Sequence, residues 1–290
     1  MYLGAHLSAT GGVWRAVHAA SRLNLEALQV FLRPPGRWRG RAPSESDVER
    51  CSQAVAGAGV RERVFVHGPY LLNPASADED HRRRSVEVLI EELQWAGALG
   101  LAGVVIHPGS AGSGDRAAAE SRCREAIAEA VEQAGPAAAA LLLEGTAGAG
   151  GQLGRNPREL AALRLPGMAG RVGVCLDFAH LWAAGYDLPA DGWNRVTGEL
   201  GEYWGVGAPD LLHGNDTATE LGAGRDRHAP PGAGVLGEVF FRRVLQDPRL
   251  ASVPMVVEIP PGEDNSEVAR VMEILRRWRG TGGDTEHRET

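Results

Sequence analysis

Eight short apolar segments recur along the chain and limit the folds that it can adopt. They are LGAHLS near Leu3, ALQVFL near Ala27, VFVHGPY near Val64, GVVIHPG near Gly103, AALLLEGT near Ala139, VGVCLDF near Val172, DLLHGND near Asp210 and PMVVEIP near Pro254. Between them, apolar residues return every three or four positions, as in the stretches that begin at Ser85, Ser121 and Asn265, which predicts helices. Continuously apolar strands are typical of parallel sheets covered on both faces, and eight strand and helix units predict a (β/α)8 barrel.

The alternative α/β fold is an open, doubly wound sheet, but no GxGxxG motif follows the first strand, so the barrel is favoured. The length of 290 residues and the absence of a long linker predict a single barrel domain over residues 1–280. The Gly/Pro-rich stretch from Gly222 to Gly237 predicts an extended loop, and residues 281–290 predict a polar, disordered tail.

Side chains that bind metals stand where the predicted strands end. Charge inside a barrel is costly unless cations neutralise it, so five histidines and four carboxylates at these positions predict a multinuclear metal site. Active sites of (β/α)8 barrels lie at the carboxyl ends of the strands, and these residues fall there or, for Asp226 and His228, in a loop leaving that face. The candidate ligands are His67, His107, Glu144, Asp177, His180, His213, Asp226, His228 and Glu258.

The chain contains no lysine, so its 30 basic residues are all arginine. A Schiff base on a side-chain amine and a GxxxxGK[ST] phosphate loop are therefore excluded, whereas hydrolysis assisted by metal ions remains open. The formal net charge of −7 argues against nucleic acid as a partner. Three divalent cations would bring that charge close to zero and concentrate positive charge in the site, so the acidity decides little.

Three cysteines, an odd number with wide spacing, favour a reduced intracellular protein over a disulfide framework. The chain opens on LGAHLS without a basic and then apolar leader, and no uncharged apolar run approaches the ~18 residues of a membrane span. We therefore expect a cytoplasmic protein that is not embedded in a membrane, and we expect it to be a monomer.

Eight ordered motifs give the chain a specific resemblance to a known family. They are GAHLSATGG at Gly4, YLLNPAS at Tyr70, HPGS at His107, EGTAGAGGQLG at Glu144, GVCLDFAHLWAAGYDL at Gly173, HGND at His213, DRH at Asp226 and VVEIP at Val256. With these motifs, the chain resembles endonuclease IV, the metal-dependent apurinic/apyrimidinic endonuclease of base excision repair, in the xylose-isomerase-like barrel superfamily.

The resemblance implies three divalent ions, usually zinc, although Mn²⁺ or Fe²⁺ suits the same nitrogen and carboxylate ligands. Matching the motifs assigns one ion to His67, His107 and Glu144, and Glu144 bridges to the second. The second ion would also take Asp177, His213 and Glu258, and the third would take His180, Asp226 and His228. The spacing of Asp177 and His180 just past a strand could direct these two residues to different ions.

The resemblance also implies the reaction, which is hydrolysis of the phosphodiester on the 5′ side of an abasic site in duplex DNA. The products are a 3′-hydroxyl and a 5′-deoxyribose phosphate. The ions would activate a water molecule and stabilise the phosphate oxygens, and Glu144 would be the catalytic residue that positions ions and nucleophile.

Two loops carry the expected contacts with DNA. Tyr70 and Leu71 match a family loop that fills the gap left by the flipped abasic nucleotide. The segment FLRPPGRW resembles another DNA-contacting loop but departs from the family pattern, with Pro34 at the usual asparagine and Gly36 at the expected arginine. Arg37 is the candidate contact here, and Arg33 is a possible substitute.

Smaller departures are Gly145 after the bridging glutamate and Ala179 before the histidine at position 180. His6 is expected to contact the metal ligands without being one.

Two rival functions use the same fold. A sugar isomerase or epimerase would normally hold one or two ions, which the third ligand group argues against. A DNA-lesion binder without catalysis would be expected to keep its DNA loops and lose its ligands, whereas this chain has all nine ligands and an altered loop.

Overall fold

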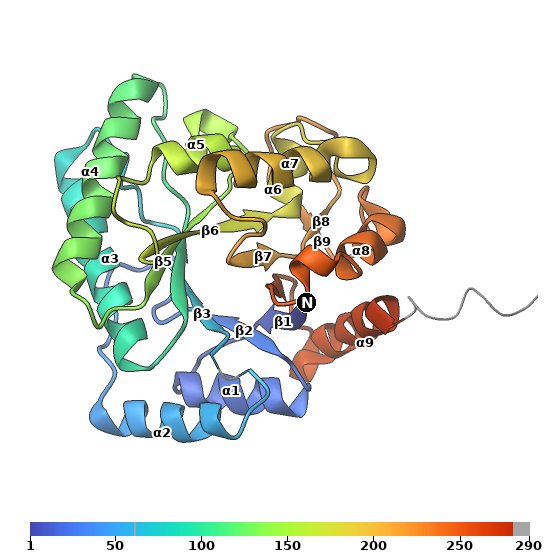
Figure 1. The fold of residues 1–290 in the computed structure, drawn as a ribbon. Helices are drawn as coiled ribbons and strands as arrows, with labels where there is room; N and C mark the ends of the chain where they lie inside the picture. Colours follow the sequence, from blue (N-terminus) through green and yellow to red (C-terminus); the bar gives the residue numbers. More distant parts are fainter. Residues whose placement is uncertain (61, 281–290) are drawn as a thin grey trace, which may run out of the picture.

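The computed structural model describes residues 1–60 and 62–280 and confirms the predicted (β/α)8 barrel (Figure 1). Eight parallel strands close the barrel in the order β1, β10, β7, β6, β5, β4, β3, β2. The strands are β1 (Tyr2–His6), β2 (Ala27–Val30), β3 (Val64–His67), β4 (Gly103–Ile106), β5 (Ala140–Glu144), β6 (Val172–Asp177), β7 (Leu211–His213) and β10 (Pro254–Val257). Each of the eight apolar segments supplies one strand. The expected tail at 281–290 lies outside the described residues.

Helices surround the barrel, and α9 lies beside the N-terminus, where Arg279 donates to the Met1 carbonyl (Figure 1). They are α1 (Val13–Arg22), α2 (Glu45–Ala56), α3 (Glu79–Ala98), α4 (Arg116–Ala134), α5 (Pro157–Ala162), α6 (Phe178–Ala183), α7 (Trp193–Glu199), α8 (Gly237–Leu245) and α9 (Ser266–Gly280). Short turns of 3-10 or π geometry lie at Ala149–Gly151, Leu188–Gly192, Leu200–Trp204, Pro248–Leu250 and Glu263–Asn265.

Two of the predicted helices begin earlier than their apolar periodicity suggests. α3 starts at Glu79 because the Asp78 side chain accepts the N–H of His81, and α4 starts after Asp115, which accepts two backbone N–H groups of its first turn. Such caps satisfy amide groups that have no partner inside the helix. Polar first turns are therefore part of these helices, although they carry no apolar stripe.

The barrel interior contains one apolar layer directly below the candidate site. Side chains alternate between the two faces of a strand, so residues two positions apart point the same way. The interior layer is Ala27, Phe65, Val105, Leu142, Cys175, Leu211 and Val256. Two positions further along the same segments stand Gln29, His67, His107, Glu144, Asp177, His213 and Glu258. The register of the strands therefore places a ring of polar side chains directly above this apolar layer.

β1 completes this ring with His6, two positions after Gly4. Gly4 pairs with Ala27 of β2, and a Cβ at Gly4 would lie 2.3 Å from the Ala27 carbonyl oxygen. Only glycine permits this approach, and His6 then takes its place beside Gln29.

The loop predicted from Gly222 to Gly237 is mostly irregular, but it contains one strand of a small ribbon. β8 (Asp216–Thr217) pairs antiparallel with β9 (His228–Ala229). All three cysteines are buried and free. In the described part of the chain, no helix is long and apolar enough to cross a membrane.

Candidate metal centre

The nine predicted ligands come together at the carboxyl end of the barrel, and all of them except Asp177 and His213 line a cavity of about 970 Å³. Three groups of side chains have donor atoms close enough to share an ion: His67, His107 and Glu144; Glu144, Asp177, His213 and Glu258; and Asp177, His180 and His228. Glu144 and Asp177 each belong to two groups. The side chains brought together are therefore those that the strand-end pattern predicted.

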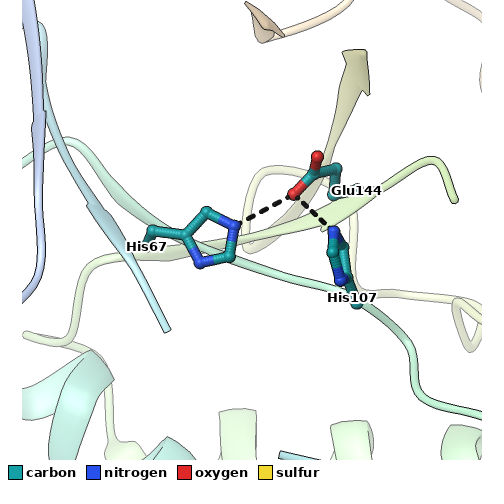
Figure 2. Close-up of side chains that lie close together, drawn as sticks. All are labelled: His67, His107 and Glu144. Carbon is teal, nitrogen blue, oxygen red and sulfur yellow. Dashed lines mark ion pairs between the residues drawn. The ribbon is translucent and has the colours of Figure 1, made fainter. Parts of the chain in front are cut away.

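Glu144 is fully buried and lies between two groups through its two oxygens. Oε2 is 3.3 Å from Nε2 of His67 and 3.2 Å from Nε2 of His107, and Figure 2 shows both rings directing a nitrogen at this oxygen. Oε1 is 3.0 Å from Nδ1 of His213 and 3.3 Å from Nδ1 of His180. A carboxylate with ligands on both sides has the geometry of a bridge between two cations.

Hydrogen bonds fix which nitrogen of three histidines faces the cavity. Nδ1 of His67 donates to the Gly68 carbonyl at 2.7 Å, and Nδ1 of His180 donates to the Gly145 carbonyl at 2.8 Å. A carbonyl only accepts, so these Nδ1 atoms carry a proton, and in the neutral ring Nε2 has the lone pair that can bind an ion. His213 is oriented the other way, because its Nε2 lies 2.9 Å from the amide oxygen of Gln29. Each ring therefore presents one nitrogen to an ion.

Asp177 has a double role that explains its spacing from His180. It is the N-cap of α6, and its Oδ1 accepts the backbone N–H of His180 at 3.0 Å. Its Oδ2 points to the centre, 3.9 Å from Nδ1 of His213 and 3.6 Å from Nε2 of His228. The cap thus holds Asp177 between two groups and turns His180 toward a third.

Asp226 and His228 reach the site from the loop after β8. Asp226 lies 2.9 Å from Nε2 of His228 and 3.3 Å from Nε2 of His180, and half of its side chain is exposed. The three predicted ligands of the third ion are therefore neighbours, and Asp177 also comes within reach of them.

The electrostatics of the centre suit bound cations. Burial alone would lower the pKa of His228, but the carboxylates of Asp177 and Asp226 raise that pKa to about 9. Burial would likewise raise the pKa of Glu258, yet His213 and other imidazoles hold it at about 2. Protons on the imidazoles thus supply part of the positive charge that metal ions would provide.

Three buried atoms of the site face ion-pair partners but make no well-oriented hydrogen bond among the residues that the structure describes. They are Nε2 of His107, Oε2 of Glu144 and Nε2 of His228. A buried polar atom without a satisfied hydrogen bond costs about 1–3 kcal/mol. Imidazole nitrogens and carboxylate oxygens are the ligands of Zn²⁺ and similar ions, so the residues fit a divalent metal centre.

Two polar residues that the sequence patterns did not single out hold the ligands in place. The Gln29 amide donates to Glu258 at 2.6 Å and contacts His213, and it also lies 3.1 Å from Nδ1 of His6. The Asn215 amide donates to Asp177 at 2.6 Å and to Glu258 at 3.1 Å, and it accepts the Glu258 N–H. The alternation of side chains along β2 does indicate Gln29, because it stands two positions after Ala27 of the apolar layer, as the ligands do in the other strands.

The predicted DNA contacts lie on two adjoining loops at the rim. Tyr70 lines the cavity with 67% of its surface exposed, and its N–H donates to the Pro35 carbonyl at 3.0 Å. Leu71 borders a neighbouring pocket together with Tyr70. Arg37 is exposed on a turn closed by its own N–H and the Pro34 carbonyl. The contacts of Tyr70, Leu71 and Arg37 with DNA stay predictions.

Arg33, the other candidate in this loop, is not available to DNA. Only 2% of its surface is exposed, and its guanidinium binds Glu92 at 2.5 Å, Glu91 at 3.0 Å and the Trp38 carbonyl at 2.6 Å. It also lies over the ring of Trp95. Arg33 is therefore an internal clamp of the loop, and the suggestion that it contacts DNA is wrong.

Comparison with known proteins agrees with this geometry. A family model described as xylose isomerase-like TIM barrel matches residues 17–278. A probable endonuclease 4 from Oleidesulfovibrio alaskensis is 41% identical over 277 residues, which cover 95% of this chain and 94% of that protein.

Among solved structures, endonuclease IV from Thermus thermophilus is 34% identical, with a TM-score of 0.84 over 96% of this chain and 98% of that one. A D-tagatose 3-epimerase-like protein is 21% identical, with a TM-score of 0.73 over 96% of this chain and 97% of that one, which shows a shared fold alone. Because the family model spans most of the chain and a 41% identical relative matches 95% of it, the chain belongs to the endonuclease 4 family of xylose isomerase-like TIM barrels.

Proposed function

We propose that the chain is a metal-dependent endonuclease that hydrolyses the phosphodiester 5′ to abasic sites in duplex DNA. The products would be a 3′-hydroxyl and a 5′-deoxyribose phosphate, as in base excision repair. The observation that carries the proposal is the position of Glu144: its Oε2 faces the imidazoles of His67 and His107, and its Oε1 faces those of His213 and His180, which belong to other ligand groups. Family membership makes DNA the substrate class, and the geometry supports a hydrolysis that uses more than one ion.

Each part of the site has a distinct task in this proposal. Bound divalent ions supply Lewis-acid stabilisation of the phosphate and activate water. Glu144 holds the ligands of two ions at a fixed separation. His67, His180 and His213 keep one nitrogen directed at the cavity through their other hydrogen bonds. Tyr70 and Leu71 would occupy the gap in the duplex, so that the abasic nucleotide enters the cavity.

We further propose three ions, most simply Zn²⁺, with Mn²⁺ or Fe²⁺ possible at one or more positions. The ligands would be His67, His107 and Glu144 for one ion; Glu144, Asp177, His213 and Glu258 for the second; and His180, Asp226 and His228 for the third. Free, buried cysteines are compatible with a reducing compartment, so we propose that the protein acts in the cytoplasm. We also propose that it acts as a monomer.

The test is incision of a labelled duplex that contains one tetrahydrofuran abasic analogue, which cannot undergo β-elimination. Metal content is assayed on the same preparation. A single cut 5′ to the analogue, with about three ions per chain and loss of activity after prolonged chelation, supports the proposal. A fully loaded protein that leaves this duplex intact rejects it and directs the next assays to sugar substrates.

Tyr70→Ala is expected to weaken the productive complex with abasic DNA by about tenfold in KM, because stacking of an aromatic ring on bases contributes ~1–3 kcal/mol. Since the ring is mostly exposed, the thermal midpoint should change little. Steady-state kinetics on the abasic duplex measure the effect. Val239→Ala, at another exposed apolar side chain, is the matched control. Equal KM values for Tyr70→Ala and wild type would show that this ring does not contact DNA.

A further inference from the structure

Asp216 is a fully buried carboxylate that binds only backbone amides among the hydrogen bonds of the described residues. It follows His213 by three positions, yet it points away from the ligand groups and into the base of the neighbouring loop. Its Oδ1 accepts two N–H groups and its Oδ2 accepts three. The donors are Thr217 at 2.8 Å and Leu236 at 2.9 Å to Oδ1, and Gly232 at 3.0 Å, Gly234 at 3.0 Å and Gly237 at 3.2 Å to Oδ2.

These amides belong to the two arms of the loop that carries Asp226 and His228. On the outgoing arm, β8 pairs with β9, so that Thr217 lies opposite His228. On the returning arm, four of the five donated N–H groups come from residues 232–237. Asp216 thus joins both arms at the base of the loop, next to the β8 and β9 pairing that carries His228, with Asp226 two positions before it.

The sequence of the returning arm is suited to this carboxylate. A Cβ at Gly234 would lie 2.3 Å from the Thr217 carbonyl oxygen and 2.4 Å from Oδ1 of Asp216. Only a residue without a side chain can bring its N–H this close. Gly234 is therefore required for the returning chain to approach Asp216 and does not merely indicate a flexible loop.

Hydrogen bonds to a charged group contribute ~1.5–3 kcal/mol each, which is about twice the value for a neutral acceptor. A carboxylate is also the only side chain with two oxygens that both accept without donating. Because five N–H groups donate to these two oxygens, an ionised Asp is more stable at this position than Asn, which has the same shape but only one acceptor oxygen. Without this anchor, the pairing of two residues in β8 with two in β9 is too short to hold the loop.

We infer that Asp216 is the positioning residue that builds the third ligand group, by fixing the loop on which Asp226 and His228 face His180. This inference rests on the proposed set of ligands for three ions. It assigns no contact between Asp216 and an ion or the substrate. The role of Asp216 is to set the distance of 3.3 Å between Asp226 and Nε2 of His180 through the backbone.

Asp216→Asn tests the inference, because either orientation of the amide places its NH₂ group against at least two backbone N–H donors. In the metal-free protein, hydrogen exchange of the amides at 226–237 should become faster. The affinity for the most weakly held zinc ion should fall by about 10- to 100-fold, as for other groups that orient ligands. Isothermal titration of the metal-free chain with Zn²⁺ and mass spectrometry of exchange measure these effects.

Two further variants keep the test decisive. Gly234→Ala approaches the same contact from the returning arm and leaves the carboxylate intact, so it should reproduce both effects. Asp210→Asn is the control, because Asp210 accepts the Val174 N–H at 2.8 Å just before β7, at the end of that strand away from the ligands. It should lower stability without changing zinc binding.

The inference is overturned if Asp216→Asn keeps the wild-type exchange rates and zinc affinities, or if the wild-type chain binds fewer than three zinc ions. It is also overturned if Asp210→Asn loses the same ion, since the effect would then be one of general stability. A wild type that binds three ions and does not cut abasic DNA rejects the proposed function alone. The comparison of zinc binding then still decides the role of Asp216.

Discussion

Glu144→Gln should reduce incision of abasic DNA by at least about 10³-fold, which corresponds to ~4 kcal/mol of lost transition-state stabilisation. The carboxylate is fully buried, and both of its oxygens face imidazole nitrogens. A glutamine retains the shape but offers one neutral oxygen and one NH₂ group. Whichever way the amide turns, one of the two ligand groups loses the Glu144 carboxylate oxygen and receives a donor in its place.

The measurement combines single-turnover incision with the metal content of the same sample. We expect the variant to fold and to hold at least one ion fewer than the wild type. Glu159→Gln is a matched control, because Glu159 binds Arg116 and Arg155 outside the metal centre and should keep both metal content and rate. Full metal content together with a rate within tenfold of wild type in Glu144→Gln would contradict the assignment of Glu144 as the bridge.

The barrel and the ligand set could be predicted from the sequence because both depend on local patterns. Each strand is a short apolar run, and each ligand of the barrel wall stands at the end of such a run. The alternation of strand side chains then places these ends on one ring. His67 and Glu258, separated by most of the chain, needed no further information to be brought to the same site.

The alternation along its strand could place Gln29 on the ring, but neither its partners nor those of Asp216 could be predicted in this way, because they lie on distant segments. Gln29 lies inside an apolar strand, and its partners His213 and Glu258 are 184 and 229 positions away. Asp216 follows the predicted ligand His213 closely in the sequence and could be taken for a ligand itself. It binds backbone amides of residues 16 to 21 positions later in the chain. An amide or carboxylate has no periodicity that would indicate its partner.

The interpretation of Arg33 failed for a related reason. A charged residue in a loop rich in proline and glycine is normally exposed, and exposure would make it a candidate for a phosphate contact. Its partner Glu92 lies 59 positions away on α3, where a glutamate is expected to face solvent. Both side chains are instead buried, with 1% and 0% of their side-chain surface exposed. Two residues that would be costly to bury singly are buried as a pair.

Arg33→Met should destabilise the protein by about 3–5 kcal/mol at pH 8, the usual cost of leaving one charge of a buried pair without its partner. The pH dependence has a defined sign. Burial raises the pKa of Glu92 from 4.5 to about 7, although Arg33 opposes this shift, so that without Arg33 the pKa should rise further. At pH 5, Glu92 is neutral in the folded state both with and without Arg33, whereas at pH 8 more of it is charged in the folded wild type than in the folded variant. The loss of stability should therefore be smaller at pH 5 and grow above pH 7 by at most about 1.4 kcal/mol per pH unit.

A second substitution separates stability from function in the same clamp. In Arg33→Met/Glu92→Met both charges of the buried pair are removed, so most of the free energy of unfolding at pH 8 should be recovered. Chemical denaturation of the wild type, the two single variants and the double variant measures the coupling energy between Arg33 and Glu92. The contact between Arg33 and the Trp38 carbonyl stays lost in this variant. Because that contact fixes the loop whose Pro35 carbonyl holds Tyr70, KM for abasic DNA should remain raised while kcat at saturating DNA stays near wild type. Recovery of KM together with stability would instead show that the loop keeps its position without Arg33, and that the clamp serves the fold alone.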